Sequence, residues 1–145
     1  MRSDIFAYAK QMDKLGDLVV SASMKVPEID RDTLKTYADV EKVRQMVKAA
    51  HREYRTCVQL LSDVNSPPEI SEEHRQIVDA FNEIVEGLQM MEESFTETNR
   101  DAKIGEDVGI INLEQYFAGH IKQLNGTKAN SDAIGKIHVK LDGLL

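Results

Sequence analysis

The sequence predicts an all-α protein, an antiparallel up-down four-helix bundle with a short additional C-terminal helix. Three observations lead to this prediction. Only three of the 145 residues are proline, so few positions interrupt a helix. Apolar residues recur at alternating spacings of three and four, which places them on one face of a helix. No segment alternates apolar and polar residues long enough to propose a strand. The length fits a single domain over residues 1–145.

The first predicted helix spans residues 4–24. Ser3 or Asp4 can cap its start, and Pro27 disfavours helical backbone in the residue before it. One face is apolar and should be buried. Its positions are Ile5, Tyr8, Met12, Leu15, Val19, Ala22 and Val26.

The second predicted helix begins near Asp30 or Asp32 and runs to Asp63, with a bend near Thr36. Because Cys57 lies on its apolar face, we interpret this single cysteine as a small buried hydrophobe, in preference to a reactive thiol. The positions of that face are Val40, Val43, Val47, Ala50, Tyr54, Cys57, Leu61 and Val64.

The third predicted helix follows the clearest break in the chain, at residues 65–69. Ser66 is predicted to cap the helix, Glu69 to reach back to it, and Pro67 to occupy the first helical position. The helix should then run to about Thr98. Its apolar face consists of Ile70, His74, Ile77, Phe81, Ile84, Leu88, Met91 and Phe95.

The last 45 residues carry a weaker helical pattern because six of the eight glycines lie there. Asn125-Gly126 is predicted to end the fourth helix as a left-handed cap, and Ser131 to cap a short final helix. The expected apolar faces are Ile110, Leu113, Phe117, Ile121 and Leu124 in the fourth helix, and Ile134, Ile137, Leu141 and Leu144 in the final one.

The net charge of −7 is concentrated in one segment, residues 66–100, which holds nine acids and two bases. An acidic protein repels nucleic-acid phosphates and anionic membrane surfaces, so neither is an expected partner. No apolar run in the chain as given is long enough for a membrane span or the core of a signal peptide.

Acidic residues form a regular row on the third predicted helix. They recur every seven residues, opposite the apolar face, with Glu83 next to the row. One interpretation is a solvated face that keeps the protein soluble. The other is a docking surface for a protein partner with a basic surface. The predicted partner-binding residues are Glu72, Asp79, Glu83, Glu86 and Glu93.

Catalytic, metal-binding and cofactor-binding motifs are not recognised. None of the four histidines follows a glutamate by three residues, as a di-iron bundle requires, and the His-Glu-x-x-His zinc motif is lacking. His74 and His120 lie on or beside apolar faces, and so does Met12, so a haem site with one methionine and one histidine ligand inside the bundle is an alternative. We prefer hydrogen-bonded histidines at the rim of the core, and we predict no cofactor.

A local pattern begins at the break before the third predicted helix. It comprises Pro67-Pro68-Glu69, then His74, then Ile77-Val78-Asp79-Ala80, and then Gly87-Leu88. This pattern resembles small helical domains of secreted or lipid-anchored bacterial proteins of unknown function. In that family a Pro-Pro-Glu turn opens a helix that carries a histidine. The resemblance covers about 30 residues. It implies a bacterial cell-envelope location, but no activity and no site residues.

We therefore expect a non-enzymatic binding or sensor domain of the bacterial cell envelope that recognises a protein or an envelope component. The first alternative is a cytosolic adaptor or immunity-type inhibitor that docks a basic partner through the acidic third helix. The second alternative is a bundle that binds haem or another cofactor. The oligomeric state is not predicted.

Overall fold

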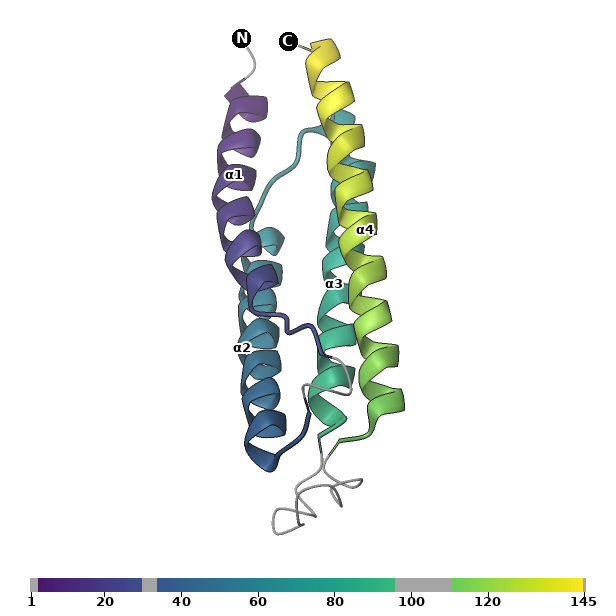
Figure 1. The fold of residues 1–145 in the computed structure, drawn as a ribbon. Helices are drawn as coiled ribbons and strands as arrows, with labels where there is room; N and C mark the ends of the chain where they lie inside the picture. The colour runs from purple at the N-terminus through teal and green to yellow at the C-terminus, as the bar shows by residue number, and fades with distance from the viewer. Residues whose placement is uncertain (1–2, 30–33, 96–110, 145) are drawn as a thin grey trace.

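The structure, a computed structural model, describes residues 3–29, 34–95 and 111–144. Successive helices run in opposite directions, so the predicted all-α antiparallel bundle is confirmed (Figure 1). In the described ranges no residue belongs to a strand, and Phe95 and Ile111 form an isolated antiparallel bridge. None of the described helices is long and apolar enough to cross a membrane. The elements are α1 (Ser3–Met24), α2 (Tyr37–Ser62), the 3₁₀ helix η1 (Pro68–Ile70), α3 (Ser71–Glu93) and α4 (Leu113–Leu144).

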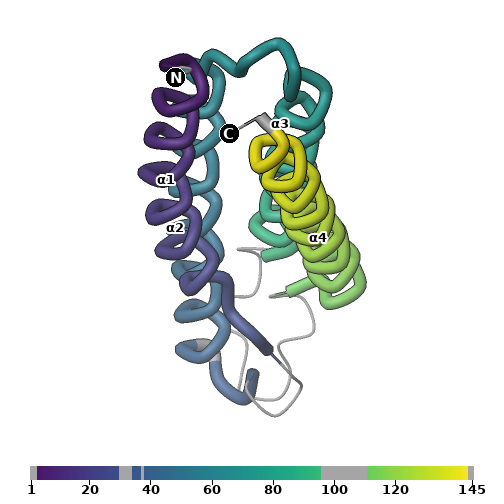
Figure 2. Tube along the Cα trace, turned by 90° about the horizontal axis from the view of Figure 1, so that it is seen from above, coloured from purple at the N-terminus to yellow at the C-terminus, as the bar shows by residue number. Residues whose placement is uncertain are grey.

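The bundle consists of two helix pairs, α1 with α2 and α3 with α4 (Figure 2). Within the first pair the helices are offset along the bundle axis (Figure 1). Just after the end of α1, Lys25 forms an ion pair with Glu53 in the middle of α2. The start of α1 lies beyond α2 and contacts α3, where Tyr8 Oη is 2.9 Å from His74 Nδ1. The lower part of the bundle in Figure 1 therefore lacks α1, and the segment after α1 crosses there towards α4.

The apolar faces predicted for the first three helices form the core. Every predicted position of the third helix is buried, and so is every position of the second helix except the half-buried Val64. Tyr54 and Phe81 pack across α2 and α3 with ring centroids 6.3 Å apart. Burial of each such large apolar side chain stabilises the fold by about 1.5–3 kcal/mol.

The start of α2 differs from the prediction. The helix begins at Tyr37, and Thr36, where a bend was predicted, is its N-cap with extended backbone. Thr36 Oγ1 accepts a hydrogen bond from the Asp39 amide at 3.0 Å, and Asp39 accepts one from the Thr36 amide at 3.1 Å. This reciprocal capping box fixes the helix start. The predicted start near Asp30 or Asp32 is wrong, since Leu34–Thr36 are not helical; residues 30–33 lie outside the described ranges.

The start and end of α3 also differ from the prediction. Pro67 keeps an extended backbone, with ψ of 147°, and is the N-cap of η1 instead of the predicted first helical residue; no side chain caps η1 by a hydrogen bond. The chain enters η1 first, and α3 begins at Ser71 without a side-chain cap hydrogen bond. The predicted Ser66 cap is therefore wrong. The helix ends at Glu93, before the predicted Thr98, which lies outside the described residues.

The last part of the chain forms one continuous helix, α4, so the predicted break at Asn125-Gly126 and the separate helix from Ser131 are wrong. Gly126 lies against α3, where an added Cβ would be 2.7 Å from Ile84 Cγ1. At Gly119 an added Cβ would be 2.6 Å from the Gly87 carbonyl oxygen. These glycines allow the backbones of α3 and α4 to approach closely, which is a different use of glycine from ending a helix.

The buried face of α4 is the predicted one only in part: Ile137 is buried, and Leu113 and Leu141 pack against the core. Phe117, Ile121 and Leu124 are exposed, and Ile110 lies outside the described residues. The physical reason is that small residues are needed where α4 meets α3. The buried positions, again spaced alternately by three and four, are Tyr116, Gly119, Gln123, Gly126, Asn130, Ala133 and Ile137.

Candidate functional site

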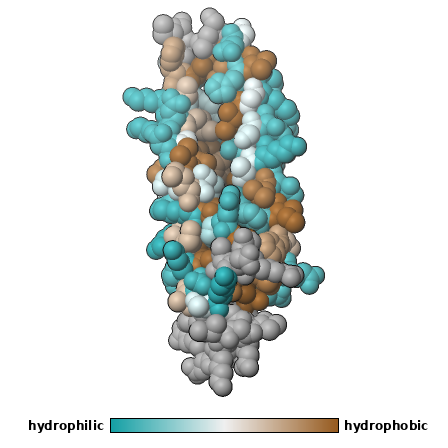
Figure 3. Space-filling model, viewed as in Figure 1, coloured by the Kyte–Doolittle hydropathy of each residue, from teal (hydrophilic) through white to brown (hydrophobic). Residues whose placement is uncertain are grey.

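A recess lies between α4 and residues 23–29, which comprise the end of α1 and the segment after it. Its volume is about 380 Å³. On the face shown in Figure 3, apolar side chains gather between α1 and α4, with hydrophilic ones on both flanks. The recess is lined by the apolar residues Val26, Pro27, Ile29, Phe117 and Leu124 and by the polar residues Ser23, Glu28, Tyr116, His120, Gln123 and Thr127.

Three polar atoms of this lining are buried and have no hydrogen-bond partner among the described residues. They are Tyr116 Oη, His120 Nδ1 and Gln123 Oε1. Tyr116 is 1% exposed and Gln123 is 4% exposed. A buried polar group without a partner destabilises a protein by about 1–3 kcal/mol. Three such groups around one recess indicate a place where a polar molecule can be held.

The side-chain amide of Gln123 has a fixed orientation. Thr127 Oγ1 donates its hydrogen to the backbone carbonyl oxygen of Gln123 at 2.9 Å, as serines and threonines inside helices often do. The hydroxyl oxygen can then only accept, and it receives a hydrogen bond from Gln123 Nε2 at 3.2 Å. Gln123 Oε1 is therefore the end of the amide left for a ligand, and it acts as an acceptor.

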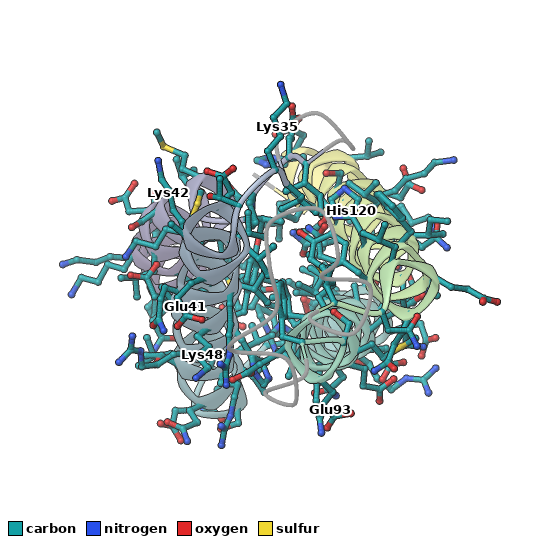
Figure 4. The ribbon with its side chains drawn as sticks, turned by 60° about the horizontal axis from the view of Figure 1, so that its bottom comes forward. Lys35, Glu41, Lys42, Lys48, Glu93 and His120 are labelled. Carbon is teal, nitrogen blue, oxygen red and sulfur yellow. The ribbon has the colours of Figure 1, made fainter. Side chains whose placement is uncertain are left out.

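His120 and Tyr116 present uncharged groups to the recess. Burial lowers the pKa of His120, and the charge of Glu28 acts in the opposite direction more weakly. The neutral ring has one nitrogen that donates and one that accepts. Burial also raises the pKa of Tyr116, which keeps its hydroxyl protonated. Figure 4 shows His120 on the inner side of α4.

The predicted partner-binding acids follow the outer side of α3 and do not gather in a recess. Glu72, Asp79, Glu86 and Glu93 are exposed, as predicted, and Glu83 is half-buried. Glu93 points away from the bundle (Figure 4). Their role in partner binding stays a prediction.

Basic residues of α4 lie beside this acidic row. Lys122 forms an ion pair with Glu86 at 3.3 Å, and Lys136 shares a shallow groove with Asp79 and Glu83. On α3 itself, Arg75 pairs with Glu72 at 2.5 Å. The row is therefore partly neutralised by a neighbouring helix, which the order of residues along the chain could not reveal.

The two histidines considered for a haem site are far apart. His120 lies next to Gly119, which contacts Gly87 of α3. Between residues 74 and 87 an α-helix rises by roughly 20 Å, so one iron cannot be bound by both His74 and His120. Burial raises the pKa of Tyr8 to about 12, so its hydroxyl stays protonated, and it forms a hydrogen bond with His74 Nδ1. In the described ranges, no group of three or more His, Cys, Asp or Glu side chains could hold a metal ion.

Sequence reasoning singled out His120 but missed the other polar residues of the recess, among them Glu28, Tyr116 and Gln123. One signal was present. Tyr116, Gln123 and Asn130 are spaced by seven residues, and a small residue follows each of them three positions later, at Gly119, Gly126 and Ala133. Polar residues that recur every seven positions among small residues are compatible with a buried helix face. The other face of the helix carries larger apolar residues, so it was predicted as the buried one.

In comparisons with known proteins, no family model, no curated protein and no solved structure matches this chain. The recess and its chemistry are therefore the basis on which a function can be proposed.

Proposed function

We propose that this protein is a non-enzymatic binding or sensor domain that holds a small polar molecule in the recess between residues 23–29 and α4. The observation that supports this proposal is the group of three buried, unpartnered atoms on Tyr116, His120 and Gln123. A ligand that supplies their hydrogen bonds removes their desolvation penalty. It also stabilises the folded state, because it binds that state and not the unfolded chain.

Binding suits these side chains better than catalysis. The fixed acceptor on Gln123 is a neutral amide, which does not exchange protons near neutral pH. The phenol of Tyr116 has a raised pKa and is therefore a poor proton donor as well as a poor nucleophile.

Titration with three probes of similar shape tests the proposal by nuclear magnetic resonance. The probes are phenethylamine, 2-phenylethanol and 3-phenylpropionate, which carry a cation, a hydroxyl and an anion on a phenylalkyl frame. At least one should shift the side-chain amide resonances of Gln123 and the ring resonances of His120. Gln123→Met should abolish the shift of the His120 ring resonances, whereas Gln59→Met, at an exposed position on α2, should leave it unchanged. If no probe shifts these resonances at millimolar concentration, the proposal is wrong.

Docking of a basic protein partner on α3 is a second candidate function. The supporting observation is that Glu72, Asp79, Glu86 and Glu93 are all exposed along one helix. Its test is a charge reversal of this face, described in the Discussion. The bacterial cell-envelope location stays a prediction from the Pro-Pro-Glu resemblance, and fractionation of the source cells tests it.

A further inference from the structure

We infer that the recess selects a small organic cation, an amine attached to an apolar body. This inference concerns the ligand class and rests on the function proposed above for the same recess. It follows from the charge of the lining, from the hydrogen-bonding capacity of the unpartnered atoms, and from the apolar walls.

Glu28 makes the lining of the recess negatively charged. Among the described lining residues it is the only one with a full charge near neutral pH, and no lysine or arginine lines the recess. Lys25, three residues before Glu28, forms an ion pair with Glu53 of α2, and Arg31, three residues after Glu28, lies outside the described residues. A cationic ligand is therefore attracted by Glu28, whereas a carboxylate would be repelled by it and would find no basic side chain in the lining.

Each of the three unpartnered atoms can accept a hydrogen bond from the same ligand. Gln123 Oε1 can only accept, because Thr127 holds the other end of the amide. A neutral imidazole can accept at Nδ1 when Nε2 carries the proton, and a phenol oxygen can accept as well. An ammonium group has three donors and no acceptor, so it complements three acceptors. A ligand carbonyl or carboxylate would leave Gln123 Oε1 unpaired.

The remaining walls suit an apolar body. Val26, Pro27 and Ile29 form one side of the recess, and Phe117 and Leu124 of α4 contribute to the other. Phe117 and Leu124 are 39% and 50% exposed, so a ligand that covers them removes apolar surface from water. The aromatic rings of Tyr116 and Phe117, 5.7 Å apart, offer additional attraction to a nearby cation.

Calorimetric titration of the full chain with the same three probes tests the inference. Phenethylamine should bind about tenfold more tightly than 2-phenylethanol, as expected for a charged hydrogen bond compared with a neutral one. The carboxylate of 3-phenylpropionate should bind most weakly. Glu28→Gln should lower the affinity for phenethylamine about threefold, which is the size expected for an exposed charge pair. The affinity for 2-phenylethanol should not change. Asp17→Asn is the matched control, since it removes one exposed acid from α1 away from the recess.

The possible outcomes separate the ligand class from the function. If 2-phenylethanol or 3-phenylpropionate binds as tightly as the amine and shifts Gln123, the preference for a cation is wrong and the recess remains a binding site. If Glu28→Gln and Asp17→Asn weaken amine binding equally, net charge explains the preference and the inference is overturned. If none of the probes binds, both the inference and the proposed function fail.

Discussion

Two of the buried tyrosines, Tyr8 and Tyr116, differ in whether the hydroxyl group has a hydrogen-bond partner. Tyr8 Oη forms a hydrogen bond with His74 Nδ1, whereas Tyr116 Oη has no partner among the described residues. Tyr8→Phe should therefore lower the free energy of unfolding by about 1–3 kcal/mol, because it leaves a buried ring nitrogen unpaired. Tyr116→Phe should leave it unchanged or raise it by up to about 1 kcal/mol. Urea denaturation measures the free energy of unfolding of both variants. Equal losses would show that Tyr116 has a structural partner and is not a site residue.

Cys57 is fully buried on α2, as the sequence predicts. Burial is the main cause that raises the pKa of its thiol, so little reactive thiolate forms near neutral pH. We predict slow reaction with a thiol reagent in the native state and rapid reaction once denaturant is added. A variant with Cys57→Ala and Ser62→Cys, which moves the thiol to an exposed position, provides the fast reference. Native labelling of Cys57 at the reference rate would contradict its place in the core.

The buried histidines predict a loss of stability in mild acid. Burial lowers the pKa of both His74 and His120 below the ordinary value of 6.5, so the unfolded chain takes up protons first as the pH falls. The two histidines therefore make their full contribution to the free energy of unfolding above pH 6.5. That contribution decreases as the pH falls from 6.5 to the pKa of the histidines in the folded protein. Urea midpoints at pH 7.5 and 5.5 should show this loss. It should become smaller in His120→Gln and remain unchanged in the exposed control His138→Gln.

At the scale of helices, the contact between α3 and α4 depends on glycine. An added Cβ at Gly126 or Gly119 would overlap atoms of α3, whereas one at Gly135 would meet nothing within 4 Å. Gly126→Ala should lower the free energy of unfolding by about 1–3 kcal/mol through overpacking. Gly135→Ala should raise it by up to about 1 kcal/mol through helix propensity alone. Thermal or urea unfolding distinguishes the two, and equal effects would contradict the close approach.

The helices also show why the sequence predicted some parts of the fold and not others. In α1, α2 and α3 the buried face is the most apolar one, so spacing alone identifies it, as at Val47 or Ile84. In α4 the buried face contains Gly119, Gln123 and Gly126, because close contact with α3 requires small residues. Sequence patterns do not reveal which neighbour a helix meets. For the same reason His120 could be singled out, but Glu28, which comes from a distant segment, could not be assigned to its recess.

For the whole molecule, the offset between α1 and α2 creates the candidate site. Because α1 ends at Met24, the lower part of the bundle has three helices, and residues 25–29 cover the side of α4 that α1 leaves free. A connecting segment packs less completely than a helix does, and the resulting space contains polar groups that a helix–helix contact would exclude. A ligand bound in the recess would therefore contact both the segment after α1 and α4.

The charge distribution of the whole molecule gives the last prediction. The net charge of −7 lies in the segment that contains α3, and four exposed acids there face solvent. If α3 docks a basic partner, an octalysine peptide should bind this face at low salt and dissociate as salt rises. Replacement of four acids by lysine raises the net charge by eight. The α3 variant changes Glu72, Asp79, Glu86 and Glu93, and the control changes the exposed acids Asp13, Asp17, Asp63 and Asp142.

Both variants should remain folded, because exposed substitutions usually change stability by less than about 0.5 kcal/mol each. The ion pairs of Arg75 and Lys122 with Glu72 and Glu86 are surface pairs whose loss has a small effect. Since both variants carry the same net charge, a difference in octalysine affinity reports the position of the acids alone. The α3 variant should lose more affinity, mainly through slower association. Equal losses would mean that octalysine responds only to net charge and that the acidic row of α3 is a solvated surface.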